Sequence, residues 1–356
     1  MKIAYGLSGV GRGHTMRASS LGTLLKNAGH DIHFFSSGDA TEPLKERFGP
    51  SRVQFLPTPE FTLVNGKLHV LKTTKGFLNF MIKERKRILK LSQQLQDQDY
   101  DVVISDFEPL LCRAALNANI PVLAFNSQNF VNVCKIPLKY RHLSAQLALV
   151  NAVIVASPDY TIVSKPVRVK TKPKKGCVVG PMIRQHIIGK IWEGKSNHIL
   201  MYRSLASDWP METMIAWAKA RGLRILFYGK LNPEEEQLIG PDFIHRPISE
   251  TQFVDDMINA QFVIGTSGTQ LIGELAYLGV PAILIPEQGQ TEQKLNALLA
   301  DDSYPNMATI SAPNITTQKL EETLDTLDGF AIRHTEDGSQ DAFQQVQNWI
   351  ENLKLK

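Results

Sequence analysis

The feature that most constrains this fold is a repeated alternation of short, almost wholly apolar segments with helical segments. In the first half, KIAYGLS, DIHFFSS, DVVISD and PVLAF predict strands, and Thr15–Ala28 predicts a helix that ends at Gly29. Continuous apolar strands separated by helices indicate a parallel sheet that is covered on both faces. We therefore expect a doubly wound α/β domain in this half, with one long basic helix over Gly76–Gln96 and a further strand at AVIVAS, residues 152–157.

The same pattern restarts in the second half. HILMYRS, RILFYG, FVIGTS and AILIP predict strands, and Thr269–Leu278 and Gln293–Leu299 predict helices between them. The chain has 356 residues, which exceeds the roughly 250 to 300 residues at which a single core stops growing. We therefore expect two Rossmann-like domains facing across a cleft, with this division: 1–180, a linker at 181–196, 197–338, and a last helix in 339–356 that packs back toward the first domain.

Composition excludes several classes of protein. The chain is 43% hydrophobic and 21% charged, as in ordinary globular proteins. Its three cysteines include no CxxC pair, so they indicate neither a disulfide framework nor a zinc site. The N-terminal segment lacks the pattern of a signal peptide, and no apolar run reaches the roughly 18 residues of a membrane-spanning helix. These features favour a cytoplasmic protein that holds no metal ion.

A glycine-rich loop follows the first predicted strand. In SGVGRGHTMR, Gly9, Gly11 and Gly13 would let backbone N–H groups approach a ligand at the start of a helix. A dinucleotide fingerprint requires the spacing GxGxxG, whereas here GxGxG is followed at once by His14. The loop therefore argues against NAD and places an imidazole, the side chain best suited to proton transfer near neutral pH, at the carboxyl end of a strand.

Other polar residues follow neighbouring strands. Asp106 ends DVVISD, where its carboxylate would either orient the imidazole of His14 or cap the helix that starts near Glu108. Arg17, one turn after His14, would either hold a phosphate or carboxylate of a substrate or form a surface pair. Asn126 and Gln128 follow PVLAF, in a polar run that suits sugar hydroxyls or is an ordinary loop. We take Gly11, Gly13, Arg17, Asn126 and Gln128 as candidates for binding an acceptor.

The most specific signal is VIGTSGTQLIGELAYLGVPAILIPEQGQTEQKLNA, residues 263–297. Its small-residue loop opens a helix, and such a loop suits a diphosphate because backbone N–H groups and the helix dipole both favour anions. Glu274 follows on that helix, and Glu292 and Gln293 start the next one. Carboxylate and amide groups beside a phosphate loop are suited to the hydroxyls of a ribose or a hexose. The alternative is a glycine-rich turn that only lets a helix and a strand pack closely.

This segment resembles the nucleotide-sugar motif of GT-B glycosyltransferases, and it is similar to those that add N-acetylglucosamine to the peptidoglycan lipid precursor. The GRGHTMR loop resembles a group of uncharacterised bacterial and archaeal glycosyltransferase-like proteins. The resemblance implies that Glu274 binds the ribose and that His14 is a base paired with Asp106. It also implies a diphosphate at Ser267, Gly268, Thr269 and Gln270, a donor sugar at Glu292 and Gln293, and a base pocket at Tyr228, Gly229 and Ile248.

The sequence departs from the GT-B pattern after HILMY. Arg203 and Ser204 stand where relatives have a glycine pair, and Arg203 is a candidate to neutralise the diphosphate. Glu287 and Gln288 stand where many relatives have an apolar or aromatic residue. The donor sugar is therefore left open.

The implied function is transfer of a sugar from a nucleoside diphosphate donor to an acceptor that is lipid-linked or belongs to the cell envelope. The resemblance favours UDP as the nucleoside diphosphate. One alternative is a UDP-sugar hydrolase or epimerase, because a GxGHxxR loop also resembles UDP-sugar hydrolases of nonulosonic acid synthesis. Another is a non-enzymatic nucleotide-binding protein. The implied transfer is metal-independent and inverting, and it requires no cofactor besides the donor substrate.

The first half of the chain is basic. It contains 25 of the 39 Lys and Arg residues but 12 of the 35 Asp and Glu residues. Part of this charge lies in residues 72–90, where Phe77, Phe80 and Met81 are available at helical spacing. We expect either a solvated helix face or a peripheral contact with an anionic membrane. No module that reads RNA or DNA is visible, so no nucleic-acid partner is expected.

Overall fold

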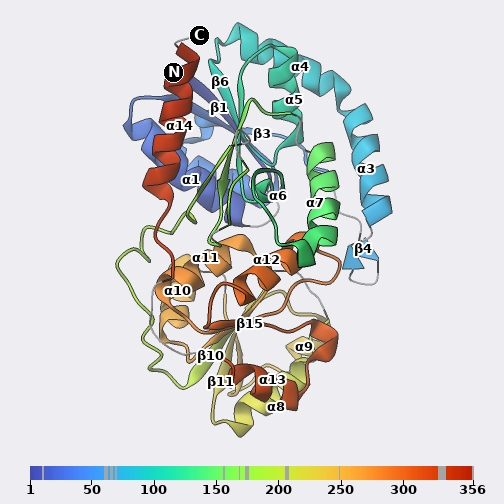
Figure 1. Ribbon diagram of the computed structural model, residues 1–356, viewed down its shortest axis with the longest axis vertical. Coiled ribbons are helices and arrows are strands. Elements are labelled where there is room, and N and C mark those ends of the chain that lie inside the picture. Colours follow the sequence, from blue (N-terminus) through green and yellow to red (C-terminus); the bar gives the residue numbers. More distant parts are fainter. Residues whose placement is uncertain are drawn as a thin grey trace. The chain divides into compact units, whose positions relative to one another are not determined.

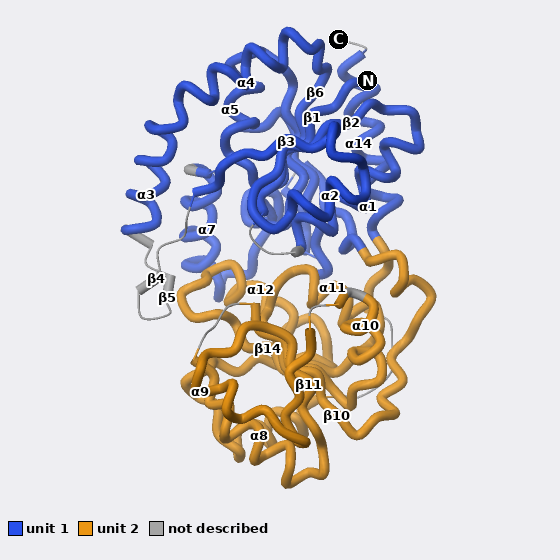
Figure 2. Tube along the Cα trace, turned by 180° about the vertical axis from the view of Figure 1, so that it is seen from behind, with its two compact units in different colours: residues 1–62, 69–182, 338–356 blue, residues 63–68, 183–337 orange. Residues whose placement is uncertain are grey.

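The computed structural model describes residues 1–9, 12–59, 63–64, 67–68, 70–154, 157–167, 169–172, 176–204, 208–247, 249–327 and 334–354. The chain forms two compact units (Figure 2). Unit 1 comprises residues 1–62, 69–182 and 338–356, and unit 2 comprises residues 63–68 and 183–337.

Unit 1 contains a parallel sheet of seven strands in the order β3-β2-β1-β6-β7-β8-β9. The strands are β1 (Lys2–Leu7), β2 (Asp31–Ser36), β3 (Val53–Phe55), β6 (Val102–Asp106), β7 (Val122–Asn126), β8 (Tyr160–Ser164) and β9 (Cys177–Val179). Strand β1 lies between β2 and β6, and its Leu7 pairs with Ser36 on one side and with Asp106 on the other. The carboxyl ends of β2, β1 and β6 therefore meet at one edge of the sheet.

Helices cover both faces of this sheet (Figure 1). Ile3, Tyr5 and Leu7 of β1 join one core cluster, which includes residues of α1 and α14, whereas Ala4 joins the cluster on the other face with residues of α4 and α5. This alternation arises because successive side chains of a strand point to opposite faces. The helices of unit 1 are α1 (Arg12–Asn27), α2 (Thr41–Phe48), α3 (Val70–Lys83), α4 (Arg85–Asp97), α5 (Pro109–Asn117), α6 (Phe130–Val133), α7 (Arg141–Ile154) and α14 (Ser339–Lys354).

Unit 2 repeats this architecture with six parallel strands in the order β12-β11-β10-β13-β14-β15. The strands are β10 (His198–Arg203), β11 (Arg224–Gly229), β12 (Phe243–His245), β13 (Val263–Gly265), β14 (Ala282–Leu284) and β15 (Met307–Thr309). The helices are α8 (Met211–Ala220), α9 (Pro233–Glu236), α10 (Glu250–Asn259), α11 (Thr269–Leu278), α12 (Thr291–Asp301) and α13 (Thr317–Leu324). A separate antiparallel pair is formed by β4 (Leu63–Val64) and β5 (Lys67–Leu68).

Two sequence predictions about unit 1 are wrong. The single helix expected over Gly76–Gln96 is divided at Glu84, whose ψ of 3° is not helical. The division lets Phe77 of α3 and Ile88 of α4 pack into different core clusters. The strand expected at 152–157 is helical over residues 152–154, which end α7, and residues 155–156 lie outside the described residues. Short apolar runs fit a strand and a buried helix end equally well.

The segment after β9 is held to unit 2 by its backbone. The N–H groups of Trp192, Glu193 and Ser196 donate to carbonyl groups of α10 and α11, and the Trp192 indole donates to the Ala260 carbonyl at 2.7 Å. Among the residues that the structure describes, no helix combines the length and the apolar character that a bilayer-spanning segment needs.

Candidate functional site

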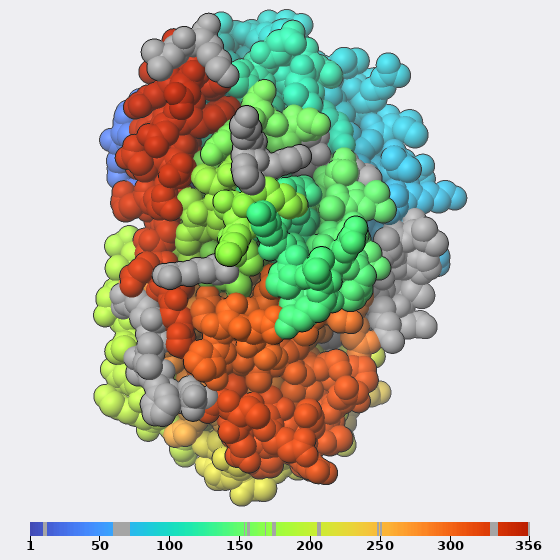
Figure 3. Space-filling model, viewed as in Figure 1, coloured from blue at the N-terminus to red at the C-terminus, as the bar shows by residue number. Residues whose placement is uncertain are grey.

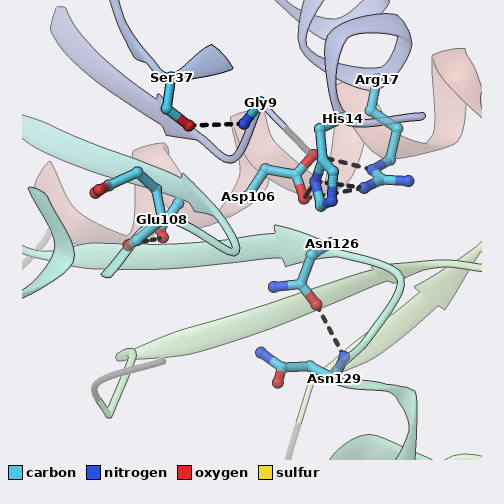
Figure 4. Close-up of polar contacts among 9 residues, drawn as sticks. Gly9, His14, Arg17, Ser37, Asp106, Glu108, Asn126 and Asn129 are labelled. Carbon is cyan, nitrogen blue, oxygen red and sulfur yellow. Dashed lines mark hydrogen bonds and ion pairs between the residues drawn. The ribbon is translucent and has the colours of Figure 1, made fainter. Parts of the chain in front are cut away.

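A buried histidine, aspartate and arginine meet at the carboxyl edge of the unit 1 sheet (Figure 4). His14 Nδ1 lies 2.8 Å from Asp106 Oδ1. Arg17 donates from Nε to Asp106 Oδ2 and from Nη2 to Oδ1, both at 3.0 Å, and its Nη2 also lies 3.0 Å from His14 Nδ1. The exposed fractions are 7% for His14, 3% for Arg17 and 0% for Asp106. We call this set the histidine cluster.

Helix α1 and strand β6 together position the histidine cluster. His14 and Arg17 are three residues apart on α1 and therefore lie on the same helix face, and Asp106 is the last residue of β6. The Ser8 N–H donates to the Asp106 carbonyl at 3.1 Å, which ties the end of β1 to the end of β6. The ion pair of Arg17 with Asp106 is buried, so the alternative of a surface pair is wrong.

The charge of Asp106 is stabilised within this cluster. Burial alone would raise the pKa of the Asp106 carboxyl, but Arg17 and His14 outweigh burial and hold that pKa below its ordinary value. Arg17 Nη2 donates to Asp106 Oδ1, and the same carboxylate beside Nδ1 favours the tautomer in which Nδ1 carries the proton and donates it. Nε2 of His14 then carries the lone pair, which is the requirement for a general base.

The glycine loop approaches the end of β2 closely. The Gly9 N–H donates to Ser37 Oγ at 2.8 Å, and a Cβ at Gly9 would lie 1.6 Å from the Ser37 carbonyl oxygen. Only glycine fits this position without a backbone shift. Gly13 is half-buried in the first turn of α1, whereas Gly11 lies outside the described residues.

Glu108, and not Asp106, caps helix α5. Its carboxylate accepts from the N–H groups of Leu110 at 3.0 Å and Leu111 at 2.6 Å, so the capping alternative for Asp106 is wrong. Burial raises the pKa of the Glu108 carboxyl to about 7, although these two N–H groups lower it. Phe107, between the two carboxylates, has a φ of 60°, a conformation that costs energy in a residue other than glycine and that clusters near functional sites.

The polar turn after β7 lies on the strand next to the histidine cluster (Figure 4). Asn126 Oδ1 accepts from the Asn129 N–H at 2.9 Å. Asn126 and Gln128 are 0% and 8% exposed, respectively. Both predicted acceptor residues therefore belong to a turn that is buried in unit 1.

In unit 2, the predicted diphosphate loop joins β13 to α11. Gly268 is the N-cap of α11 and supplies no capping side chain. The loop is clamped by α12, because Ser267 Oγ donates to the Gln293 carbonyl at 2.8 Å and Asn296 Nδ2 donates to the Ser267 carbonyl at 3.2 Å. A helix N-terminus of this kind is the type of site at which anions bind in proteins.

Glu274 lies on α11 within this region and is 1% exposed. Arg184 donates from Nε to Glu274 Oε1 at 2.6 Å and from Nη2 to Oε2, and Gln270 Nε2 donates to Oε1 at 2.9 Å. The Arg184 guanidinium also lies over the Phe253 ring at 5.4 Å. Sequence analysis missed Arg184, since a lone arginine in GPMIR carries no signal until its partner is known.

Arg203 is 1% exposed and is engaged inside unit 2. It donates to both carboxylate oxygens of Glu235, at 2.8 and 2.6 Å, and to the Lys230 carbonyl at 2.7 Å. The pKa of the Glu235 carboxyl, which burial alone would raise, is lowered mainly by this hydrogen bond. The charge of Arg203 is therefore compensated by a carboxylate, and the arginine supports the end of β10.

Two further predicted donor residues, Tyr228 and Gly229, lie at the carboxyl end of β11. Tyr228 donates to Asp256 Oδ2 at 2.6 Å, and burial, followed by this hydrogen bond, raises the pKa of its hydroxyl. Gly229 has a φ of 147°, and a Cβ there would lie 2.4 Å from the Arg203 carbonyl oxygen. Ile248 lies outside the described residues.

The loop that contains Glu287 connects the remaining candidates. Ser204 Oγ donates to Glu287 Oε1 at 3.1 Å, and Gln293 Oε1 accepts from the Glu287 N–H at 3.1 Å. Glu292 is half-buried in the first turn of α12. Glu287, which departs from the family pattern, thus links the ends of β10 and β14 to the start of α12.

Comparisons with known proteins agree with this architecture. Residues 1–327 match the family model of glycosyl transferase family 1. An uncharacterized glycosyltransferase of Methanosarcina acetivorans is 27% identical over 339 residues, covering 88% of this chain and 87% of the relative.

Solved structures show the same fold. MurG of Acinetobacter baumannii has a TM-score of 0.63 at 17% identity, covering 98% of this chain and 100% of MurG. LpCGTa has a TM-score of 0.66 at 14% identity, covering 98% of each chain. These comparisons and the two parallel sheets confirm the GT-B class that the sequence resemblance implied. The chain belongs to glycosyl transferase family 1.

Proposed function

We propose that this chain transfers a sugar from a nucleoside diphosphate donor, a UDP-sugar, to a hydroxyl group of an acceptor, with His14 as the general base. The observation that carries the proposal is the buried contact between His14 Nδ1 and Asp106 Oδ1 at 2.8 Å. A carboxylate in this position orients the imidazole and stabilises it once it is charged. Proton removal by a positioned base contributes about 10²- to 10⁴-fold to a rate.

The reaction proposed is a single displacement. Nε2 of His14 accepts the proton of the acceptor hydroxyl while the oxygen bonds to the anomeric carbon. The bond from that carbon to the diphosphate oxygen breaks, and the nucleoside diphosphate leaves. One base and no covalent intermediate imply inversion at the anomeric carbon. Asp106, whose pKa is lowered, remains a carboxylate throughout and neutralises the imidazolium.

Unit 2 is proposed to bind the donor. The N–H groups at the start of α11 stabilise charge on the leaving diphosphate in the way a metal ion does in other folds. The carboxylate of Glu274, which is hydrogen-bonded by Arg184, accepts the ribose hydroxyls. Support for UDP comes from LpCGTa, which was solved in complex with UDP.

The acceptor is proposed to be lipid-linked or part of the cell envelope, and the protein to be a cytoplasmic one that contacts an anionic membrane. Helices α3 and α4 carry the cations of residues 72–90, and these helices lie at the surface of unit 1 (Figure 3). These helices also carry exposed apolar side chains: Leu78 and Ile82 of α3 are 53% and 75% exposed, and Leu89 of α4 is 56% exposed. A groove of about 530 Å³ beside α4 is lined by Arg85, Ile88, Leu89, Arg113, Leu116 and Asn117.

The apolar residues expected to face the membrane are not the exposed ones. Phe77 is 4% exposed and packs against Ile154, and Phe80 and Met81 are half-buried against the core. We therefore propose that Leu78 and Ile82 make the contact. Helical spacing alone did not identify which face of the segment packs inward.

The proposed reaction is tested by incubating the enzyme with UDP-sugars and a lipid extract. Transfer predicts that UDP release depends on the extract and that the sugar becomes extractable with lipid. Release of UDP with only free sugar would instead support a hydrolase, in which water takes the place of the acceptor. No UDP release from any UDP-sugar by the folded enzyme would contradict the proposal.

The membrane contact is tested by sedimentation with vesicles. Wild-type protein should bind vesicles that contain phosphatidylglycerol, and the Leu78→Ser and Ile82→Ser double variant should bind at least about tenfold more weakly, because each side chain gives up about 1.5 kcal/mol or more of apolar burial. Leu138→Ser is the control, since Leu138 is 84% exposed but lies outside α3 and α4. Equal binding by all variants would rule out this surface.

A further inference from the structure

Three buried side-chain atoms without a hydrogen-bond partner gather around the turn after β7. They are Asn126 Nδ2, Gln128 Oε1 and Asn151 Oδ1. Their side chains belong to residues that are 0%, 8% and 1% exposed. Buried polar atoms are nearly always hydrogen-bonded in folded proteins, so each exception requires a physical reason.

The orientations of two of the three amides are fixed by their other atom. Asn126 Oδ1 accepts from the Asn129 N–H at 2.9 Å, which leaves Nδ2 as the spare donor. Asn151 Nδ2, on α7, donates to the Gln128 carbonyl at 2.7 Å, which leaves Oδ1 as the spare acceptor. Rotating either amide by 180° would place two donors or two acceptors together. The spare atoms of Asn126 and Asn151 are therefore a defined donor and a defined acceptor, respectively.

These three atoms belong to residues that meet at one turn, which distinguishes them from the other buried atoms without a hydrogen-bond partner in the described residues. Asn306, in unit 2, is a matched case: it is 0% exposed, its Nδ2 donates to the Val280 carbonyl at 3.0 Å, and its Oδ1 has no partner. Asn306 directly precedes β15 and so lies at the amino end of that strand, away from the carboxyl edge. Asn126 of unit 1 instead ends β7, which lies beside β6, the strand that ends at Asp106 (Figure 4).

We propose that Asn126, Gln128 and Asn151 form a subsite that binds the hydroxyl groups of a sugar ring in the acceptor, an inference that rests on the proposed function. One donor and two acceptors match hydroxyl groups, because each hydroxyl can both donate and accept. A phosphate or carboxylate would meet the two spare oxygens with like charge. An apolar acceptor group would leave all three atoms unsatisfied.

Asn151 is the residue that this subsite adds to the candidates. It is distant in sequence from the β7 turn, and only the contact of α7 with that turn brings it there. Asn151 lies on α7, so the acceptor sugar is hydrogen-bonded by a helix as well as by the end of β7. It touches the acceptor and not the donor, so its loss should leave nucleotide binding intact.

The test is saturation-transfer NMR with methyl glycosides of glucose, galactose, mannose and N-acetylglucosamine as probes. Gln128→Met removes the spare oxygen, and Asn151→Leu removes the amide at similar volume. Asn306→Leu is the matched control, since it also deprives one backbone carbonyl of a buried amide. Binding of UDP to each variant is measured by calorimetry on the same samples.

We expect at least one glycoside to bind wild type and Asn306→Leu, with signals reduced about tenfold or more in Gln128→Met and Asn151→Leu, as the loss of a hydrogen bond to a ligand predicts. Equal signals in all four proteins would overturn the inference, as would the absence of any glycoside signal from wild type. If UDP binds while glycosides do not, the subsite fails and the donor site stands. If glycosides bind while UDP does not, the proposed function fails and the sugar subsite stands.

Discussion

Both units place a buried arginine–carboxylate pair near the carboxyl ends of their strands, and the pair of unit 1 also contacts a histidine. In unit 1, Arg17 pairs with Asp106 and His14 touches both. In unit 2, Arg184 pairs with Glu274, and the neighbouring polar group is the amide of Gln270. A titratable imidazole suits proton transfer, whereas a carboxylate and an amide suit hydroxyl binding. This difference supports the proposal that unit 1 carries the chemistry and that unit 2 binds the donor.

The largest effect that would test this division is the loss of the imidazole. His14→Ala should lower kcat about 10²- to 10⁴-fold, because proton removal from the acceptor would lose its base, and it should leave KM for the donor unchanged. Steady-state kinetics with the lipid extract as acceptor measures both constants. A kcat within about threefold of wild type would show that the histidine cluster is structural.

The second test breaks the pair in unit 2. Arg184→Ala should destabilise the protein by about 3 to 5 kcal/mol, because the buried Glu274 charge would lose its partner. The double variant Arg184→Met and Glu274→Met should recover most of that loss, since apolar residues of similar size often replace a buried ion pair. Urea denaturation measures both. The double variant should be folded yet unable to bind UDP, and UDP binding by it would contradict the assignment of unit 2.

The third test separates two carboxylates at the edge of unit 1. The pKa of Asp106 is lowered, so its stabilisation is present above the ordinary value of 3.8 and is lost as the pH falls. The pKa of Glu108 is raised to about 7 from 4.5, so its stabilisation is present below the ordinary value and is lost as the pH rises through about 7. Glu108→Gln should therefore remove a decline in unfolding free energy of at most about 3 kcal/mol between pH 5 and 8.

Urea denaturation at several pH values, with wild type as the reference, measures that decline. The Gln side chain keeps one oxygen that can accept from one of the two N–H groups at the start of α5, so part of the helix cap is retained. An unchanged pH slope in Glu108→Gln would mean that Glu108 does not titrate in this range.

The sequence predicted the fold where the local pattern was unambiguous. Apolar strands such as KIAYGLS and DVVISD each lie between turn residues, and they were placed correctly at β1 and β6. Thr269–Leu278 matches α11 because a small-residue loop and Gly279 mark its two ends. Residues 152–154 were misplaced because an apolar run at the end of α7 lacks such markers.

The contacts between residues distant in the chain could not be predicted from the sequence. The local sequence pattern did predict that Asp106 ends a strand and that His14 lies at the start of a helix. The pairing of Arg17 with Asp106, and of Arg184 with Glu274, depends on which strands are neighbours and how the helices pack on them. Arg203 illustrates the same limit, because Glu235, its partner, is 32 residues away.

The most direct test of the division between the units is calorimetric titration of UDP into wild type, His14→Gln and Glu274→Gln. Wild type and His14→Gln should bind UDP with the same dissociation constant, since His14 belongs to unit 1. Glu274→Gln should bind at least about tenfold more weakly, because a charged acceptor for the ribose hydroxyls is lost. Failure of folded wild type to bind UDP, or an equal loss of affinity in His14→Gln, would contradict the assignment of the donor to unit 2.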